Sequence, residues 1–136
     1  MSSDFFRRTV NVGVFRQYPV VMQKREVERL AEKYGIDISG IKFKIVADSD
    51  LIGNTYTGWT DPVKLGHVQL YPDAFISEEQ LIRTLLHEKA HVMWLTKYYA
   101  KHNIKYMLKS NEASTYLEKR AYRYENLWYT YLVRRA

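Results

Sequence analysis

Residues 85–94, Leu-Leu-His-Glu-Lys-Ala-His-Val-Met-Trp, place two histidines four positions apart in a segment of helix-compatible residues. Side chains four residues apart lie on the same face of an α-helix, so His87 and His91 are expected to hold one zinc ion together. Glu88 falls on the neighbouring stripe, where its carboxylate can take a proton from a water that the metal activates. The alternative is a solvated polar face on which two histidines align by chance. Because the chain has only four histidines, we favour the metal site.

The composition limits which kind of metal site is possible. The chain contains no cysteine, so a zinc site has to use histidine and carboxylate ligands, which are typical of catalytic zinc sites. Its 136 residues, 46% hydrophobic and 26% charged, predict a single globular domain spanning residues 1–136. No segment approaches the roughly 20 apolar residues of a membrane helix, so we expect no membrane partner. The first residues lack the apolar core of a signal peptide, so we expect nothing in this chain to export it unaided.

The net charge of +6 favours an acidic partner. The basic residues are scattered along the chain, often at helical spacing, as on solvated helix faces. Twelve tyrosines and three tryptophans lie among them, and aromatic residues interleaved with cations can bind single-stranded nucleic acid. Packing of a small domain explains the aromatic residues more simply. Nucleic-acid binding by a non-catalytic basic module is therefore kept as the alternative function.

Hydrophobic periodicity predicts four strands and three helices. Alternating patterns indicate strands at 9–15 and 41–46. Strand-favouring composition indicates another at 55–59, and a further strand at 67–71 ends before Pro72. The last two are expected to pair antiparallel. The first helix is expected to begin at Pro19 and to end at Gly35. Ser77 and Gln80 form a capping-box signature that opens a helix from Glu78 to Ala100.

A last helix is predicted from Asn111 to Val133. The element order predicts an α+β domain in which a small mixed β-sheet packs against the histidine-bearing helix and the C-terminal helix. Regular spacing marks the residues expected to face the core: Val27, Leu30, Ala31 and Tyr34 in the first helix, Leu81, Leu85, Val92 and Leu95 in the second, and Leu117, Ala121, Tyr124 and Leu127 in the last.

A catalytic zinc site needs a third protein ligand and an open position. Glu112 and Glu118 in the last helix are the two candidates. Glu112 lies in the first turn of that helix. A favourable interaction with the helix dipole is an alternative explanation for a carboxylate at this position. Glu118 has the small residue Ala121 about one turn further on nearly the same face, which lets two helices approach closely. We favour Glu118 and keep Glu112 as the alternative.

The pattern His-Glu-x-x-His followed by a glutamate on the next helix resembles that of the gluzincins, a group of zinc metallopeptidases. The second half of the chain is also similar to the zincin-like metallopeptidase domains that end bacterial polymorphic toxins. This similarity is carried by residues 70–75, 79–81 and 83–91, and by the later residues Glu118, Ala121, Tyr122 and Glu125.

The resemblance implies a zinc-dependent peptidase and assigns roles to residues. It implies His87, His91 and Glu118 as metal ligands and Glu88 as general base. Tyr122 stands where the family carries an aspartate that orients a ligand histidine. Apart from the resemblance, Tyr116 and Tyr122 are candidate oxyanion donors, although among twelve tyrosines packing explains each of them more simply.

The resemblance also implies how the protein meets its partners. The strand at 67–71 is expected to be an edge strand that pairs with a protein or peptide substrate. A toxin domain would be delivered as the C-terminal part of a larger secreted bacterial protein and would meet an immunity protein, for which the basic charge favours an acidic surface. A zinc hydrolase of another amide or ester would use the same residues.

Overall fold

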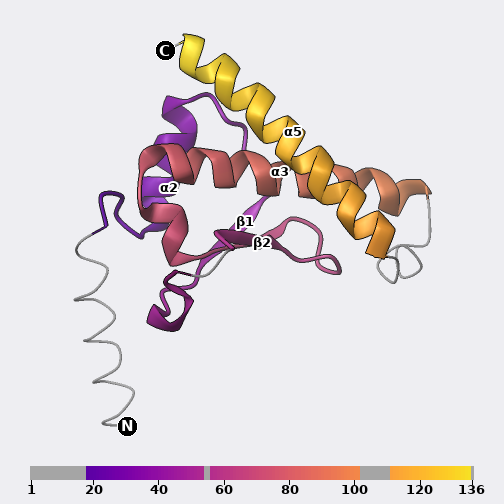
Figure 1. Ribbon diagram of the computed structural model, residues 1–136, viewed down its shortest axis with the longest axis horizontal. Helices are drawn as coiled ribbons and strands as arrows, with labels where there is room; N and C mark the ends of the chain where they lie inside the picture. Colours follow the sequence, from indigo (N-terminus) through magenta and orange to yellow (C-terminus); the bar gives the residue numbers. More distant parts are fainter. Residues whose placement is uncertain (1–17, 54–55, 102–110, 136) are drawn as a thin grey trace, which may run out of the picture.

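The structure, a computed structural model, describes residues 18–53, 56–101 and 111–135. Helix α2 (Lys24–Lys33) comes first, followed by strands β1 (Lys42–Ile45), β2 (Gly58–Thr60) and β3 (His67–Leu70). Two long helices complete the chain, α3 (Glu78–Lys101) and α5 (Asn111–Arg135). In Figure 1, α3 lies between the sheet and α5, which crosses it on the side away from the strands. The predicted α+β class is confirmed.

The sheet has three strands in the order β1-β3-β2. β1 pairs with β3 in parallel and β2 pairs with β3 antiparallel, so the predicted mixed sheet and the predicted antiparallel pair are both confirmed. The prediction that residues 67–71 form an edge strand is wrong, because β3 is paired on both sides. The strand beside α3 with an open edge is β2, which begins at Gly58 rather than at Thr55.

The prediction that the first helix begins at Pro19 is also wrong, since α2 begins at Lys24. The segment before it is held against another part of the chain. Val20 is buried, and its N–H donates to the carbonyl of Phe75 at 3.3 Å, which draws residues 18–22 away from helical geometry. The predicted end is confirmed: Gly35 has φ +69°, and the Ile36 N–H donates to the Ala31 carbonyl at 2.8 Å in a helix-terminating motif.

The bounds of α3 agree with the prediction to within a residue. The Gln80 N–H donates to Ser77 Oγ at 3.0 Å, as the capping signature predicts. Leu81, Leu85 and Leu95 are buried as expected. Buried residues on further stripes of α3 pack against the sheet, α2 and α5, and they include Ile82, Leu86 and Ala90.

One predicted core residue of α5 is not in the core. Leu117 and Ala121 are buried, but Leu127 is 66% exposed. The buried stripe continues instead through Glu125 and Leu132. Glu125 lies four residues after Ala121 and therefore on its face, whereas Leu127 is rotated by about 200° from Glu125 at 3.6 residues per turn. The buried face of α5 therefore carries a charged residue, and the leucine that hydrophobic periodicity predicts in the core is exposed.

The predicted strand at 9–15 lies outside the described residues. Among the helices of the described ranges, none is long and apolar enough to cross a membrane.

Candidate metal centre

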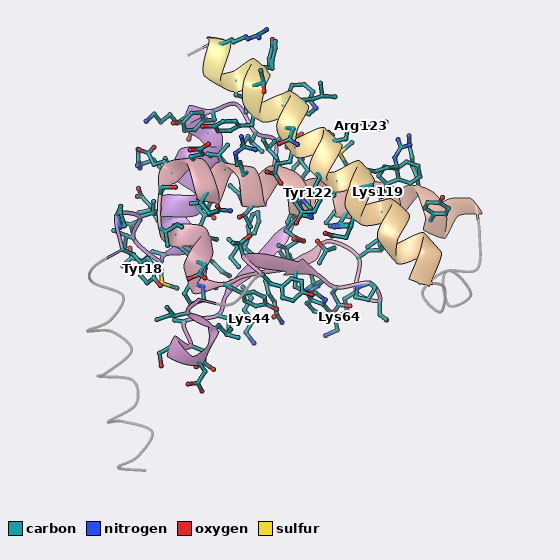
Figure 2. All side chains as sticks on the ribbon, viewed as in Figure 1. Tyr18, Lys44, Lys64, Lys119, Tyr122 and Arg123 are labelled. Atoms are coloured by element: carbon teal, nitrogen blue, oxygen red, sulfur yellow. The ribbon has the colours of Figure 1, made fainter. Side chains whose placement is uncertain are left out.

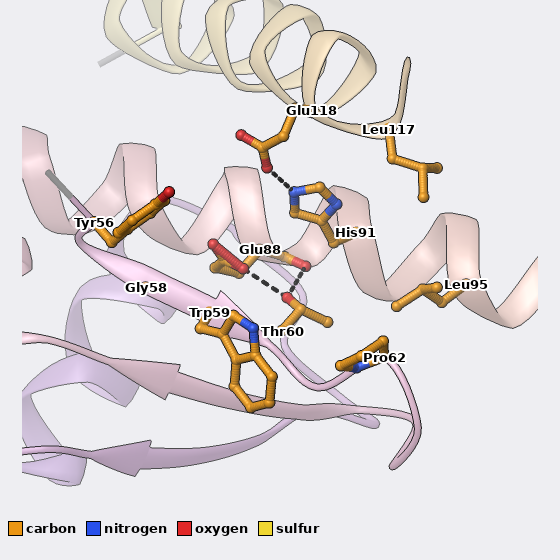
Figure 3. Close-up of a pocket in the computed structure, with 10 residues that line it drawn as sticks. All are labelled: Tyr56, Gly58, Trp59, Thr60, Pro62, Glu88, His91, Leu95, Leu117 and Glu118. Carbon is orange, nitrogen blue, oxygen red and sulfur yellow. Dashed lines mark hydrogen bonds and ion pairs between the residues drawn. The ribbon is translucent and has the colours of Figure 1, made fainter. Parts of the chain in front are cut away.

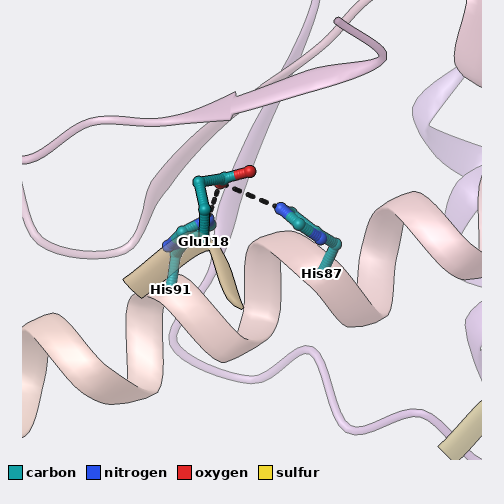
Figure 4. A group of neighbouring side chains, drawn as sticks. All are labelled: His87, His91 and Glu118. Carbon is teal, nitrogen blue, oxygen red and sulfur yellow. Dashed lines mark hydrogen bonds and ion pairs between the residues drawn. The ribbon is translucent and has the colours of Figure 1, made fainter. Parts of the chain in front are cut away.

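His87 and His91 of α3 and Glu118 of α5 converge on one point (Figure 4). Glu118 Oε1 lies 3.1 Å from His87 Nε2 and 2.5 Å from His91 Nε2. The two rings come from successive turns of α3, and their centroids are 5.0 Å apart. Ala121, fully buried one turn after Glu118, lets α5 approach α3 this closely.

These three residues form a group that could hold a metal ion. One ligand atom from each lies within 4.8 Å of the others. His87 is buried and the side chain of Glu118 is 47% exposed, so the group spans from the interior to the surface. Two imidazole nitrogens and one carboxylate oxygen are a donor set that suits catalytic zinc, for which they leave a fourth position open.

Charge is concentrated at this group. Burial would lower the pKa of His87, but its hydrogen bonds to Glu118 and Glu125 outweigh burial and raise that pKa to about 9. The same bonds from His87 and His91 hold the pKa of Glu118 well below its usual range. A carboxylate that stays ionised is available as a metal ligand, whereas His87 has to lose a proton before its Nε2 can bind a cation.

Glu88 lies beside the group, on the stripe of α3 that faces β2. It is 5% exposed, and burial is the main cause that raises its pKa. The Thr60 hydroxyl donates to Glu88 Oε2 at 2.6 Å, which opposes that rise and fixes the carboxylate (Figure 3). A Cβ on Gly58 would lie 3.1 Å from Glu88 Cγ, so the missing side chain at Gly58 leaves room for this carboxylate.

A cleft opens over Glu88 and over two members of the metal group, His91 and Glu118. It is bounded by β2 on one side and by α3 and α5 on the other, and Figure 3 shows it continuing to an apolar end. Its lining consists of Tyr56, Gly58, Trp59, Thr60, Pro62, Glu88, His91, Leu95, Leu117 and Glu118.

The open edge of β2 borders this cleft. Tyr71 N donates to Thr57 O and Asp61 N to His67 O, each at 2.9 Å, so residues 57 and 61 are hydrogen-bonded positions of the ladder. Because such positions alternate along an antiparallel strand, Gly58 and Thr60 direct their main-chain N–H and C=O groups away from β3. Within the described ranges, no strand pairs with that edge.

The structure brings together four residues that the sequence singles out: His87, Glu88, His91 and Glu118. Glu112 lies in the first turn of α5, and its side chain and that of Tyr116 lie outside the described part of the structure. Tyr122 is 55% exposed, and its ring packs edge-on against His87 with centroids 4.4 Å apart.

The sequence assigned no role to three residues that contact the metal group or Glu88 directly or through one further residue: Thr60, Arg83 and Glu125. Thr60 has no local signal, because its contact with Glu88 depends on how β2 lies across α3. Glu125 does have one, since it lies seven residues and about two helical turns after Glu118, on the same face. Arg83, which contacts Glu125, also has a local signal, because it lies four residues and about one turn before His87 on the same face of α3.

No protein-family model, no curated protein and no solved structure matches the chain. Its function therefore has to be inferred from its own residues.

Proposed function

We propose that this chain is a zinc-dependent metallopeptidase, in which His87, His91 and Glu118 hold the ion and Glu88 is the general base. The observation that carries the proposal is the convergence of two imidazoles and a carboxylate beside a second carboxylate that is buried and held by a hydroxyl. A polar face without a function would not need to bury Glu88 next to a cleft.

The metal ligands, Glu88 and Thr60 would have different roles in the reaction. A zinc ion held by the three ligands would polarise the scissile carbonyl and lower the pKa of water to about 7. Glu88 would take the proton of the attacking water and deliver it to the leaving amine. Its raised pKa brings it closer to neutral pH, where proton transfer in both directions is efficient. The Thr60 hydroxyl keeps one carboxylate oxygen fixed, leaving the other for this exchange.

The open edge of β2 supports a peptide as substrate. An extended peptide could add to Gly58 and Thr60 by main-chain hydrogen bonds, which would place its backbone over Glu88 and the metal group. This assigns to β2 the role that the sequence assigned to residues 67–71. The apolar end of the cleft, formed by Pro62, Leu95 and Leu117, suits a nonpolar side chain of that peptide.

Tyr122 is the candidate donor to the oxyanion. Burial and then the nearby carboxylates, Glu118 first, raise the pKa of its phenol, so the hydroxyl stays protonated and can donate. Its contact with the His87 ring keeps it beside the metal group.

We further propose that the peptidase acts as a toxin or effector domain that an immunity protein inhibits. The resemblance of the second half of the chain to toxin domains supports this role, and the net charge of +6 favours an acidic inhibitor. Expression in bacterial cells should stop growth for the wild type and not for Glu88→Gln. Equal growth of the two strains at equal protein levels would contradict a toxic peptidase.

The alternative of a nucleic-acid-binding module has less support. Figure 2 shows Lys44 and Lys64 on the sheet side and Lys119 and Arg123 on α5, so these cations are divided between two layers. Binding to a phosphate backbone would favour their collection on one face, and it would fall steeply with salt. It would also be indifferent to Glu88→Gln.

The test is hydrolysis of a denatured protein mixture, with new N-termini labelled and sequenced. The zinc-loaded wild type should generate new termini, and both Glu88→Gln and chelated wild type should generate none. A wild type that holds no zinc would overturn the proposal. Zinc without peptide cleavage, but with hydrolysis of other amides or esters in a Glu88-dependent manner, would keep the site and change the substrate class.

A further inference from the structure

The imidazole of His87 is held between two carboxylates of α5. Glu118 Oε1 lies 3.1 Å from Nε2, and Glu125 Oε1 lies 3.2 Å from Nδ1 on the other side of the ring. Glu125 is 9% exposed, so this second contact is shielded from water. The two glutamates are seven residues apart, which puts both on the face of α5 that meets α3.

Glu125 is itself fixed by Arg83. Arg83 Nη1 donates to Glu125 Oε2 at 3.0 Å, so one oxygen of the carboxylate contacts the arginine and the other contacts His87. Further contacts hold the guanidinium in place: Asn126 Oδ1 at 2.9 Å, Glu79 Oε1 at 3.3 Å and the Tyr129 ring at 4.1 Å. With both oxygens engaged, the carboxylate of Glu125 has little freedom to turn.

The two candidate ligand histidines differ in this respect. His91 also presents Nε2 to Glu118, but its Nδ1 has no hydrogen-bond partner in the described part of the chain. Tyr122, which stands where the gluzincin resemblance leads one to expect an acid, packs against the His87 ring and contacts neither nitrogen within hydrogen-bonding distance. The carboxylate behind His87 comes from one helical turn further along α5.

We propose that Glu125, anchored by Arg83, is the residue that positions His87 for metal binding. By accepting the Nδ1–H, Glu125 selects the tautomer whose Nε2 lone pair points toward Glu118 and His91. Arg83 keeps that acceptor in place and also ties α3 to α5 on the side of His87 away from the cleft. The inference rests on the proposed function, because it assumes an ion between the three ligands.

Glu125→Gln tests this role, since it keeps the shape of the side chain and removes its charge. Zinc affinity, measured by competition with a chromophoric chelator, should fall about 10- to 100-fold. The matched control is Glu79→Gln, which removes the same charge from another partner of Arg83 that has no contact with His87. An exposed ion pair contributes little, so the control should stay within about threefold of the wild type.

A second readout separates positioning from general stability. Nitrogen NMR of the metal-free protein, labelled at histidine, should show His87 with its proton on Nδ1 when it is neutral. Wild type and Glu79→Gln should share this tautomer, and Glu125→Gln should show a mixture. If Glu125→Gln fails to fold, Glu125→Asp gives the same test, with an intermediate loss of affinity expected because the shorter chain keeps its charge.

The outcomes distinguish the inference from the function beneath it. Glu125 variants that bind zinc as tightly as the wild type would overturn the role of Glu125 and leave the metal centre standing. Equal losses in Glu125→Gln and Glu79→Gln would also overturn it, because the effect would then belong to Arg83 and helix packing. A wild type without zinc would overturn the proposed function itself.

Discussion

Helix α3 carries the candidate chemistry on two neighbouring stripes that different parts of the molecule hold in place. On one stripe, Glu88 faces β2 and a single hydroxyl fixes it, that of Thr60. On the other, His87 faces α5, where Glu118 and Glu125 contact its two nitrogens. The sheet therefore positions the proposed base and α5 positions the proposed metal ligands. This separation means that mutations on the sheet side should reduce hydrolysis and leave zinc bound, whereas mutations of the ligands on the α5 side should reduce both.

The largest difference between the loss of cleavage and the loss of zinc is expected for Glu88→Gln. The amide cannot accept the proton of the attacking water, so the cleavage rate should fall by about 10²- to 10⁴-fold. Zinc content should stay at the wild-type level, since Glu88 is not a proposed ligand. Both quantities are measured on one preparation, by N-terminal labelling and by elemental analysis. Loss of zinc along with activity would show that Glu88 also supports metal binding. It would contradict the proposed division between the sheet and α5.

The α5 side should impose a pH dependence on metal binding. The pKa of His87 is raised to about 9 from its ordinary value of 6.5, because hydrogen bonds to the two glutamates outweigh burial. Between these pH values zinc has to displace a proton, so its affinity should rise up to about tenfold per pH unit. Chelator competition from pH 6.5 to 8.5 measures this slope. An affinity independent of pH would show that His87 is already neutral.

The same shift predicts the sign of a stability change in the metal-free protein. A group whose pKa is raised in the folded state stabilises the fold fully below its unfolded-state pKa. This contribution should therefore be complete below about pH 6.5 and should be lost as the pH rises through about 9. Melting temperatures of the metal-free wild type and of His87→Gln should converge toward alkaline pH. Parallel curves would contradict the assigned shift.

Substitution of Thr60, the residue of the sheet that holds Glu88, should give the smallest effect. Thr60→Val removes the hydrogen bond to Glu88 and keeps the shape of the side chain, so cleavage should fall about tenfold, in line with a bond to a charged group. Thr60→Ser keeps the hydroxyl and serves as the matched control, with activity near that of the wild type. Zinc affinity should be unchanged in both. A loss of zinc in Thr60→Val would mean that the sheet also supports the metal ligands.

Local sequence patterns were enough to predict the central part of this site. The spacing of His87 and His91 depends only on helical geometry, and Ser77 marks the start of their helix within one turn. Glu118 could be chosen because Ala121 follows it on nearly the same face. These features need no knowledge of how the helices and strands pack together.

The features that the sequence predicted wrongly depend on tertiary packing. Strand order cannot be derived from alternation, so the sequence predicts β3 as an edge strand, whereas the edge strands of the described sheet are β1 and β2. Leu127 fits a helical repeat, yet Glu125 occupies the buried position because Arg83 and His87 satisfy its charge. Pro19 favours a helix start in isolation, but the contact of Val20 with Phe75 holds that segment outside the helix.

The most direct test of the metal centre is the zinc content of purified protein, measured by elemental analysis for the wild type, Glu118→Ala and Glu112→Ala. We predict about one zinc per chain in the wild type and in Glu112→Ala, and a near-complete loss in Glu118→Ala. A loss confined to Glu112→Ala would transfer the third ligand to the first turn of α5. A wild type that holds no zinc, even after zinc is added back, would contradict the metal centre.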